Sequence, residues 1–451
     1  MSLSRNTLNE KWFLKNILPA TFDNSSVSSN VSFAYIDTFK KKIGFLKLLS
    51  TNLSFKKAPN SIFQTSEVID YMIDSVILGY TCFLHMDELR NDAVYASIKG
   101  HKLPSEKVCR DLIKAMSGSS LKELKLINKR LLEMQANGKK RDVVMNFDDT
   151  VCTIFGKQEG ASVGYNPRYH GRPSFKEKLG IIANTNELVD ITLEDGKHHT
   201  NNGFLDFVKS CERQLPDCLK IKRIRVDRGA FDHNNMSYFE AQGYEYVIKA
   251  KNQAWIKCFI DEVNRKEHLY PWTQIDKTFS ANEIYAKMPA WEKARRIVII
   301  RKKLPNHKNG QITIDLDEFK YEYQAIVTNI EYMTPTEIFH EYNQRCDIEN
   351  KIDELKEGFA FDQNSQRNKL CNEIFLLIKM IAYNLHNWFK QAILPEFMRH
   401  HEISTLRRIL YNVAGNIVGN GWYKHIRYPN VPLLKTIIPQ IRKALMSFSL
   451  V

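Results

Sequence analysis

The stretch EYNQRCDIENKIDELKEGF, at residues 341–359, carries the spacing that decides the fold assignment. Its polar residues Tyr342, Arg345, Glu349 and Lys356 are offset by 0, 3, 7 and 14 positions. At about 100° per residue on an α-helix, these offsets fall within an arc of roughly 60°. The spacing therefore predicts a helix face that presents a carboxylate, two cations and a phenol, which places a metal ligand among phosphate-binding groups.

Apolar residues on the same stretch predict a buried side of this helix. They form a stripe roughly 80° around from the polar face, and they are Ile348, Ile352, Leu355 and Phe359. The helix can therefore pack against a core while its polar face stays open. The simpler alternative is a solvated face on which Arg345 and Glu349, four positions apart, form a surface ion pair of about a few tenths of a kcal/mol.

Two acidic segments elsewhere in the chain each follow a strand-like run. Asp148 and Asp149 come after the apolar run in RDVVMNFDDT, and Asp227 comes after the one in IKRIRVDRGAFD. Both sites are therefore expected at strand ends, where the ligand-binding groups of open α/β sheets gather. The alternative is that each belongs to a turn, an Asx turn before Thr150 and a turn in which Gly229 supplies a positive φ.

These three segments together resemble the DDE transposases of bacterial insertion sequences, in the ribonuclease H-like superfamily branch with the signature Y-x2-R-x3-E-x6-K. The match is complete on the motif stretch, and it extends to Asp148-x-Thr150 and Asp227-x-Gly229. It includes the segments FGKQEGASVGYNPRYHGRPSF and YEYVIKAK, so it covers most of residues 140–390. The resemblance implies an α/β fold: a ribonuclease H-like catalytic core with a mixed sheet and flanking helices.

The resemblance also implies that Asp148, Asp227 and Glu349 are the catalytic residues and the ligands of two Mg²⁺ ions, for which Mn²⁺ can substitute. Relatives place the first ligand two residues before a threonine, which favours Asp148 over Asp149. Mg²⁺ prefers hard oxygen ligands and keeps several waters, which suits a few carboxylates plus a substrate phosphate. Two such ions about 3.5–4 Å apart can activate the attacking oxygen and stabilise the leaving one in phosphoryl transfer.

DNA is the expected partner of the motif helix. Arg345 can bind a phosphate through its planar fork, Lys356 as a compact charge, and Tyr342 by donating its hydroxyl. The resemblance implies that these residues hold the transposon end beside the metals. The composition agrees with a polyanionic partner, because 65 Lys and Arg residues against 51 Asp and Glu residues give a net charge of +14.

A β-rich insertion domain is expected at residues 252–322. The separation of 122 residues between Asp227 and Glu349 (349 − 227) is too long for one strand and one helix. The segment alternates aromatic, basic and β-prone runs, with Asn309-Gly310 as a hairpin turn. Relatives use such an insertion to grip transposon-end DNA.

Trp291, followed by Arg295 and Arg296, is the candidate DNA contact in this insertion. Relatives in some cases stack a flipped base on an aromatic side chain, and such stacking is worth roughly 1–3 kcal/mol. The alternative is that Trp291 belongs to the core, and Trp255 and Trp272 are weaker rivals for the role.

An N-terminal helical DNA-binding domain is expected at residues 1–140. The sequence predicts one helix over residues 68–84, a capping box at Ser120 and Glu123, and a helix from near Ser105. The last helix carries Lys107 and Arg110 and resembles the recognition helix of a helix-turn-helix, which would read terminal inverted repeats. The alternative is an ordinary solvated basic helix.

The remaining boundaries follow from these assignments. The catalytic core occupies residues 141–251 and 323–390, and residues 391–451 form a C-terminal region. In relatives that region helps to pair two subunits, so a homodimer on paired DNA ends is expected; the alternative is a packing extension of the core. In the loop after the first strand, Arg168, His170 and Arg172 are either DNA contacts or a solvated basic surface.

The sequence thus predicts a Mg²⁺-dependent DNA transposase that binds terminal inverted repeats, cleaves the DNA ends and transfers the 3′-hydroxyl to target DNA. A hairpin step assisted by Trp291 is a further expectation. The alternatives are a domesticated DNA-binding protein and a nuclease without strand transfer. No membrane partner is expected, because the apolar run at residues 374–385 is interrupted by Lys379 and is too short to span a bilayer. A cytoplasmic, nucleoid-associated location is expected, because the N-terminus resembles no signal peptide and the eight cysteines include no C-x2-C pair.

Overall fold

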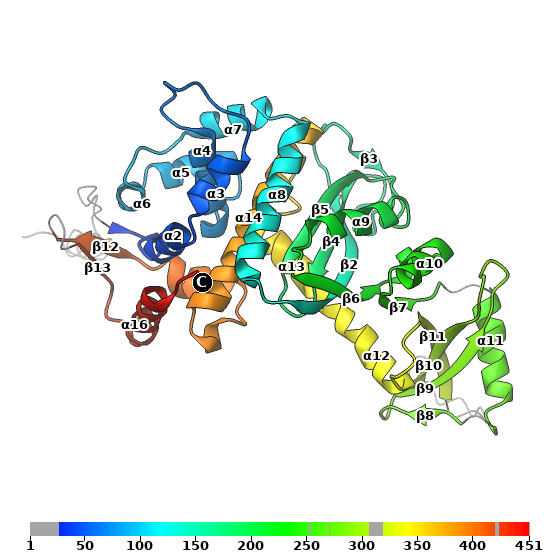
Figure 1. Cartoon of the computed structure of the whole chain (residues 1–451). Coiled ribbons are helices and arrows are strands. Elements are labelled where there is room, and N and C mark those ends of the chain that lie inside the picture. Colours follow the sequence, from blue (N-terminus) through cyan, green and yellow to red (C-terminus); the bar gives the residue numbers. More distant parts are fainter. Residues whose placement is uncertain (1–26, 252–253, 270, 306–318, 420–423, 451) are drawn as a thin grey trace, which may run out of the picture.

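The computed structural model describes residues 27–251, 254–269, 271–305, 319–419 and 424–450. A helical part built largely from the N-terminal region lies at one end of the molecule, and a smaller β-rich part lies at the other (Figure 1). Between them is a mixed sheet with helices on both faces. The protein is therefore a mixed α/β fold with many helices.

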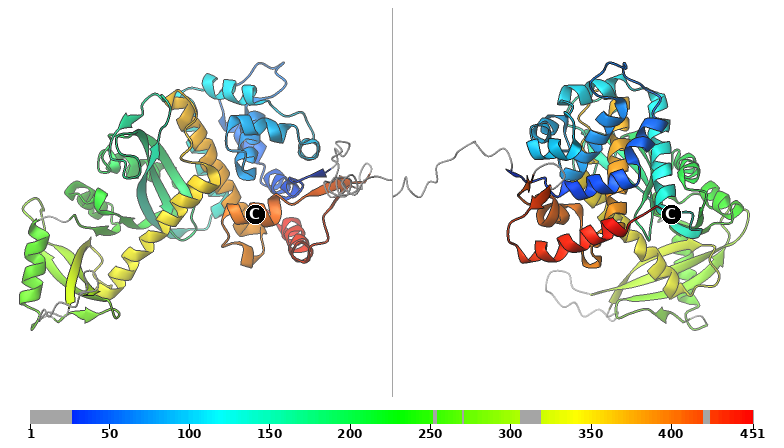
Figure 2. Two further views of the ribbon diagram at one scale, coloured as in Figure 1. Left: turned by 180° about the vertical axis from the view of Figure 1, so that it is seen from behind. Right: turned by 60° about the vertical axis from the view of Figure 1, so that its left-hand side comes forward.

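The helical part packs around one long buried helix, α14 (Lys369–Ile393). Figure 2 shows α14 running between this part and the sheet. The apolar run at residues 374–385 lies within this buried helix. The other helices are α2 (Phe33–Lys42), α3 (Phe45–Asn52), α4 (Thr65–Leu78), α5 (Phe83–Arg90), α6 (Ala93–Lys99), α7 (Glu106–Ala115) and α8 (Gly118–Ala136).

Local signals explain where these helices begin and end. Ser105 caps α7, as the sequence predicts. The long apolar run expected as one helix is two, because Gly79 takes a φ of 100° and ends α4 before α5 begins. The capping box expected at Ser120 and Glu123 is also wrong, since Ser117 caps α8 and Ser120 is its partner in the box.

The central sheet holds both predicted acidic segments. Strands β2, β6 and β7 are parallel, whereas β4 pairs antiparallel with β2 and β5 with β4. In spatial order the strands are β3 (Ser162–Val163), β4 (Pro173–Ile182), β2 (Arg141–Thr153), β6 (Leu219–Val226) and β7 (Glu245–Lys249), with β5 (Leu188–Asp195) on β4. One face is covered by α9 (Phe204–Gln214) and α10 (His233–Ala241), and the other by α8, α14 and α13 (Asp347–Phe359).

The β-rich part extends this sheet instead of forming a separate one. Strand β11 pairs with β7 of the core on one side and with β10 on the other. The boundary expected at residue 322 therefore falls within β11, and Asn309-Gly310 lies outside the described residues. The elements are α11 (Ala254–Arg265), β8 (Thr273–Gln274), β9 (Phe279–Ala286), β10 (Arg295–Pro305) and β11 (Phe319–Thr328).

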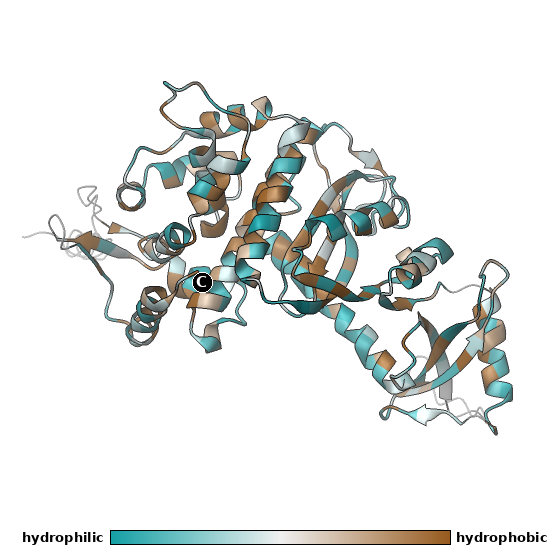
Figure 3. Ribbon diagram, viewed as in Figure 1, coloured by the Kyte–Doolittle hydropathy of each residue, from teal (hydrophilic) through white to brown (hydrophobic). Residues whose placement is uncertain are grey.

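The motif stretch joins the β-rich part to the central sheet. It forms α12 (Pro335–Asn343), a 3-10 turn (Gln344–Cys346) and α13, so the prediction of one uninterrupted α-helix is wrong at residues 344–346. In Figure 3, α12 is largely polar, while apolar residues follow the strands of the sheet. The predicted apolar stripe on α13 is confirmed, because all four of its residues are buried.

The C-terminal region returns to the helical part. Strands β12 (Gly415–Val418) and β13 (His425–Arg427) form an antiparallel pair, and β1 (Val27–Ser28) joins them. Helix α16 (Pro432–Ser447) packs on α2 and α14 through Leu434, Ile437, Ile441 and Leu445. Among the described residues, no single helix meets the length and hydropathy expected of a membrane span; only the bent pair α4 and α5 does so together, on length and composition alone.

Candidate active site

Two carboxylates meet where β2 and β6 run side by side. The register places Asn146 opposite Arg225, an offset of 79 positions (225 − 146), and the same offset separates Asp148 from Asp227. Residues opposite each other on neighbouring strands point to the same face, so the two aspartates are neighbours. The prediction that Asp148 lies at a strand end is wrong, because β2 continues to Thr153. Asp148 instead lies just beyond the level at which the parallel strand β6 ends, so its carboxylate is still beside Asp227.

A tight turn fixes Asp227 after β6. Its Oδ1 accepts a hydrogen bond from the Gly229 amide at 2.7 Å, so the predicted turn is present as well as the predicted site. Gly229 does not supply the positive φ that the alternative assumed. A Cβ atom at this position would instead lie 2.7 Å from the methyl carbon of Thr200, so close packing is what requires glycine.

Arg345 connects the first aspartate to the motif glutamate. Its Nη1 lies 3.4 Å from Asp148 Oδ2 and 3.3 Å from Glu349 Oε1. The two carboxylate oxygens are therefore no further apart than the sum of these distances. Arg345 is buried, whereas the Glu349 side chain is 62% exposed, so the glutamate faces the solvent side of the site.

The electrostatics of the site favour a further positive charge. Burial raises the pKa of Asp148 to about 7; Arg345 opposes this rise, and the neighbouring Asp227 and Asp149 carboxylates add to it. Burial also raises the pKa of Tyr342 to about 12, so its phenol is a hydrogen-bond donor at neutral pH. Three carboxylates with one buried guanidinium between them thus form a site that a bound cation would stabilise.

Asp149 has a different environment from Asp148. Successive residues of a strand point to opposite faces, and Asp149 forms an ion pair with Lys176 of β4 at 3.3 Å. Arg345 and Glu349 are on the side of Asp148. The contacts through Arg345 therefore favour Asp148 as the first ligand, in agreement with the sequence-based preference, although Asp149 and not Asp148 lines the open groove beside Asp227.

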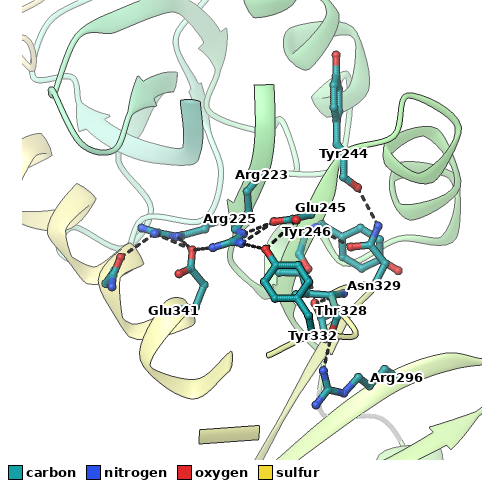
Figure 4. Close-up of polar contacts among 12 residues, drawn as sticks. Arg223, Arg225, Tyr244, Glu245, Tyr246, Arg296, Thr328, Asn329, Tyr332 and Glu341 are labelled. Atoms are coloured by element: carbon teal, nitrogen blue, oxygen red, sulfur yellow. Dashed lines mark hydrogen bonds and ion pairs between the residues drawn. The ribbon is translucent and has the colours of Figure 1, made fainter. Parts of the chain in front are cut away.

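Two arginines of β6 fasten the motif stretch to the sheet (Figure 4). Arg225 Nε donates to Glu341 Oε1 at 2.8 Å, and its Nη2 donates to Gln344 Oε1 at 2.7 Å. Arg223 Nη1 lies 2.7 Å from the same Glu341 oxygen, and its Nε donates to Glu245 of β7 at 2.9 Å. Because Gln344 precedes Arg345, these contacts position the bridging guanidinium.

Sequence reasoning missed this network, although a signal was present. Arg223, Arg225 and Asp227 alternate along β6, so they share one face of the strand. Two cations on the face that carries a predicted ligand indicate that anionic partners pack there. The partner Glu341 also lies just outside the four motif positions, which explains why it was not singled out.

An open groove of about 820 Å³ begins at Asp227 and passes the motif lysine. Lys356 lines it, two helical turns beyond Glu349 on α13. Of the proposed ligands and motif residues, Asp227 and Lys356 line this groove, whereas Asp148, Tyr342, Arg345 and Glu349 are not among its lining residues. One wall is lined by residues of the β2–β4 loop, the segment 154–172 that includes the short strand β3, among them Phe155, Tyr165, Arg168 and Tyr169.

The three predicted DNA contacts of the β-rich part are buried, namely Trp291, Arg295 and Arg296. Trp291 is 4% exposed, and its ring packs edge-to-face on Trp255 and on Phe231 of the loop after Asp227. Arg295 binds Glu240 of α10 at 2.8 Å, and Arg296 binds Glu283 of β9 at 2.7 Å. Trp291 therefore belongs to the core in this structure, as the alternative held. Its stacking on a base, and DNA contacts by Arg295 and Arg296, stay predictions that require the part to rearrange.

The basic residues of α7 and of the β2–β4 loop are at the surface. Lys107 is exposed, and Arg110 forms an ion pair with Glu106 one turn earlier on α7. Arg168 lines the groove, whereas His170 and Arg172 are exposed beside it. The structure thus places the loop beside Asp227 but leaves α7 in the helical part. That α7 reads the terminal inverted repeats stays a prediction.

The donor set suits a hard divalent cation, although the carboxylates are not gathered around one. Among the described residues, no three His, Cys, Asp or Glu side chains lie close enough to hold a metal ion. Arg345 supplies positive charge between Asp148 and Glu349 instead. All three carboxylates are oxygen donors, and burial, the largest cause of the raised pKa of Asp148, disfavours its ionised form, which a bound cation would stabilise. The residues therefore fit a divalent ion if the Arg345 side chain moves aside.

Comparison with known proteins finds a family model that matches nearly the whole chain. The family model described as "Transposase DDE domain group 1" matches residues 13–449. A solved structure described as a cryo-EM structure of the piggyBac transposase synaptic complex with hairpin DNA aligns with 12% sequence identity and a TM-score of 0.40, covering 93% of this chain and 80% of that chain. No curated protein sequence matches.

Proposed function

Because the chain belongs to the group 1 family of DDE transposases, we propose that it binds the terminal inverted repeats of an insertion sequence, cleaves the DNA ends and transfers the 3′-hydroxyl to target DNA. The meeting of Asp148 and Asp227 on neighbouring strands, with Glu349 brought to them by Arg345, is the observation that carries this proposal. These three side chains come from distant parts of the chain, and a purely structural role explains their convergence poorly.

The proposed catalytic core is ribonuclease H-like. A long strand, β2, has an antiparallel neighbour on one side and a parallel neighbour on the other, with helices on both faces. Aspartates on β2 and after β6, and a glutamate on a packed helix, then occupy one end of the sheet. The β-rich part is an insertion between the second and third carboxylates.

Members of this family typically use divalent metal ions. In this chain Asp148, Asp227 and Glu349 would hold them; Mg²⁺ is the proposed metal, with two ions bound, and Mn²⁺ is a substitute. Divalent ions held there supply charge stabilisation to the attacking and leaving oxygens of a phosphoryl transfer. The Asp148 carboxyl has a pKa of about 7 without metal, so a bound cation favours its ionised form.

The other motif residues bind and orient the DNA strand. Once Arg345 leaves the carboxylates, its guanidinium can donate two parallel hydrogen bonds to the oxygens of a phosphate. The Tyr342 hydroxyl stays protonated at neutral pH and donates a hydrogen bond. Lys356 provides a compact charge further along the groove. The same arginine thus balances the carboxylates in the free protein and the phosphate in the complex.

The proposed partners are double-stranded DNA of the element's ends and of the target. A homodimer on paired ends and a cytoplasmic, nucleoid-associated location are part of the proposal. The packing of α16 on α2 and α14 supports the role of the C-terminal region as an extension of the fold. A subunit-pairing role requires a further surface of the same region.

The test is DNA cleavage by an isosteric variant at the second ligand. Asp227→Asn should abolish Mg²⁺-dependent cleavage and joining of a duplex that ends in the repeats flanking the reading frame, while binding to that duplex persists. Asp217→Asn, at an exposed position, is the matched control. Normal cleavage by Asp227→Asn would show that the site is wrong.

The same assay separates the alternatives. A wild-type protein that binds the ends without cutting them is a domesticated DNA-binding protein. One that cuts without joining is a nuclease without strand transfer. The intact carboxylates oppose the first alternative, and the resemblance of the Tyr342, Arg345 and Lys356 set to the transposase signature opposes the second.

A further inference from the structure

Three large aromatic side chains are exposed on one wall of the groove. Phe155 is 67% exposed, Tyr165 is 74% exposed and Tyr169 is 43% exposed. All three belong to the loop that connects β2 to β4, and all three line the groove that contains Asp227 and Lys356. Exposed apolar surface of this kind marks interaction sites, and the proposed roles of the motif residues do not use it.

The loop is held in place by specific contacts. The buried Asn166 side chain donates to Thr153 Oγ1 on β2 at 2.9 Å and accepts from the Tyr169 amide at 3.0 Å. At Gly164 an added Cβ atom would lie 1.8 Å from the carbonyl oxygen of Gly196, so the backbone approach there requires glycine. The aromatic residues are therefore presented outward by an anchored loop.

The rings are combined with positive charge. Phe155 and Tyr169 pack edge-to-face with ring centroids 5.4 Å apart, and the Arg172 guanidinium lies 5.1 Å from the Phe155 ring. Arg168 lines the same wall. Aromatic faces beside cations are the chemistry that binds single-stranded nucleic acid, in which bases stack on the rings and phosphates contact the cations.

A duplex does not match this surface as well as a single strand does. Bases inside a duplex are stacked on each other, so their faces reach an aromatic ring only after unpairing. The loop also begins at the end of β2, the strand that carries Asp148, and Thr153 on that strand is its anchor. A strand whose phosphate lies at the carboxylates would therefore reach the rings with its next nucleotides.

We propose that Phe155, Tyr165 and Tyr169, with Arg168 and Arg172, form a stacking platform for unpaired bases of a single DNA strand beside the carboxylates. The proposal rests on the proposed function for its biological substrate. The platform is separate from the motif helix and from Trp291, which lie on other elements. It gives the groove a preference for DNA whose end is opened.

The first experiment measures binding alone, without metal. Fluorescence anisotropy of a labelled short oligothymidine, in EDTA, should show binding to the wild type that weakens at least about tenfold in Phe155→Ala/Tyr165→Ala, since stacking contributes strongly for each base. Tyr165→Phe should bind as the wild type does, whereas Tyr165→Leu should not. Phe397→Ala, at an exposed aromatic residue outside the groove, is the matched control.

A 2-aminopurine base in the strand provides a direct readout of stacking. Its fluorescence should be quenched by the wild type and by Tyr165→Phe, and not by the double variant. Equal affinity and equal quenching in the wild type and the double variant would overturn the proposal. Cleavage of the element's ends is measured separately: a wild type that binds the single strand through the platform but cuts no DNA refutes the proposed function and leaves the platform standing.

Discussion

Two aromatic–arginine clusters of this protein share one contact geometry and differ in what surrounds it. The Arg295 guanidinium lies 5.1 Å from the Trp291 ring in the β-rich part, and the Arg172 guanidinium lies 5.1 Å from the Phe155 ring at the groove. The first arginine also binds Glu240, and the first ring is buried. The second ring is mostly exposed. An aromatic residue close to basic residues is therefore available to a ligand only when the fold leaves both accessible.

Substitution of the two aromatic residues should separate the clusters by stability. Trp291→Ala removes a buried ring that packs on Trp255 and Phe231, so it should lower the free energy of unfolding by about 3–5 kcal/mol. Tyr165→Ala, at the exposed cluster, should change it by no more than about 0.5 kcal/mol. Urea unfolding followed by circular dichroism measures both, and a small loss in Trp291→Ala would contradict the core assignment.

The arginines should differ in the same direction. Arg295→Ala leaves Glu240 without its closest cation, so it should lower the free energy of unfolding by about 3 kcal/mol. Arg172→Ala should leave stability nearly unchanged and weaken binding of the oligothymidine. Similar unfolding midpoints for the two variants would mean that the Arg295 ion pair is not structural.

The contrast between buried and exposed side chains can also be tested with carboxylates, through the pH dependence of the free energy of unfolding. Glu177 of β4 is fully buried, and burial raises its pKa to about 7 from an ordinary value of 4.5. An acid with a raised folded pKa holds its proton more tightly when folded, so stability is highest below about pH 4.5 and falls as the pH rises towards 7. The decline should approach about 3 kcal/mol, and Glu177→Gln, which keeps the shape of the protonated side chain, should lack it.

The variant also removes a negative charge near Lys379, so its stability at any single pH differs from that of the wild type for a second reason. The two proteins are therefore compared by the slope of their stability against pH. Thermal unfolding between pH 4.5 and 7 gives the slope, and Glu88→Gln, at an exposed position of α5, is the control. Parallel curves for the wild type and Glu177→Gln would contradict the predicted titration.

The smallest expected effect concerns the anchor of the exposed cluster. Asn166→Ala removes two hydrogen bonds of the loop, so it should cost about 1–2 kcal/mol of stability. It should also weaken binding of the oligothymidine, because the rings are no longer held outward. Unchanged binding with reduced stability would separate the loop anchor from the platform.

Local periodicity could be predicted from the sequence, whereas the contacts between segments far apart in the chain could not. The apolar stripe of α13 and the strands that carry Asp148 and Asp227 follow local patterns, so they were found. The 3-10 turn before α13 and the burial of Trp291 depend on partners far away in the chain, such as Arg225 and Phe231. The ion pair of Arg345 with Glu349 was foreseen as the alternative for the motif, but the second contact of Arg345 with Asp148 was missed, because it joins residues far apart in the chain.

The central claim is that Asp148, Asp227 and Glu349 hold divalent ions against a DNA strand. A crystal structure with element-end DNA and Mn²⁺, with the metal located by its anomalous scattering, tests it most directly. We predict metal peaks bound by all three carboxylates, with the Arg345 side chain moved from between Asp148 and Glu349 onto a phosphate. DNA bound in the groove with Arg345 still bridging the carboxylates, and no metal at them, would contradict the account.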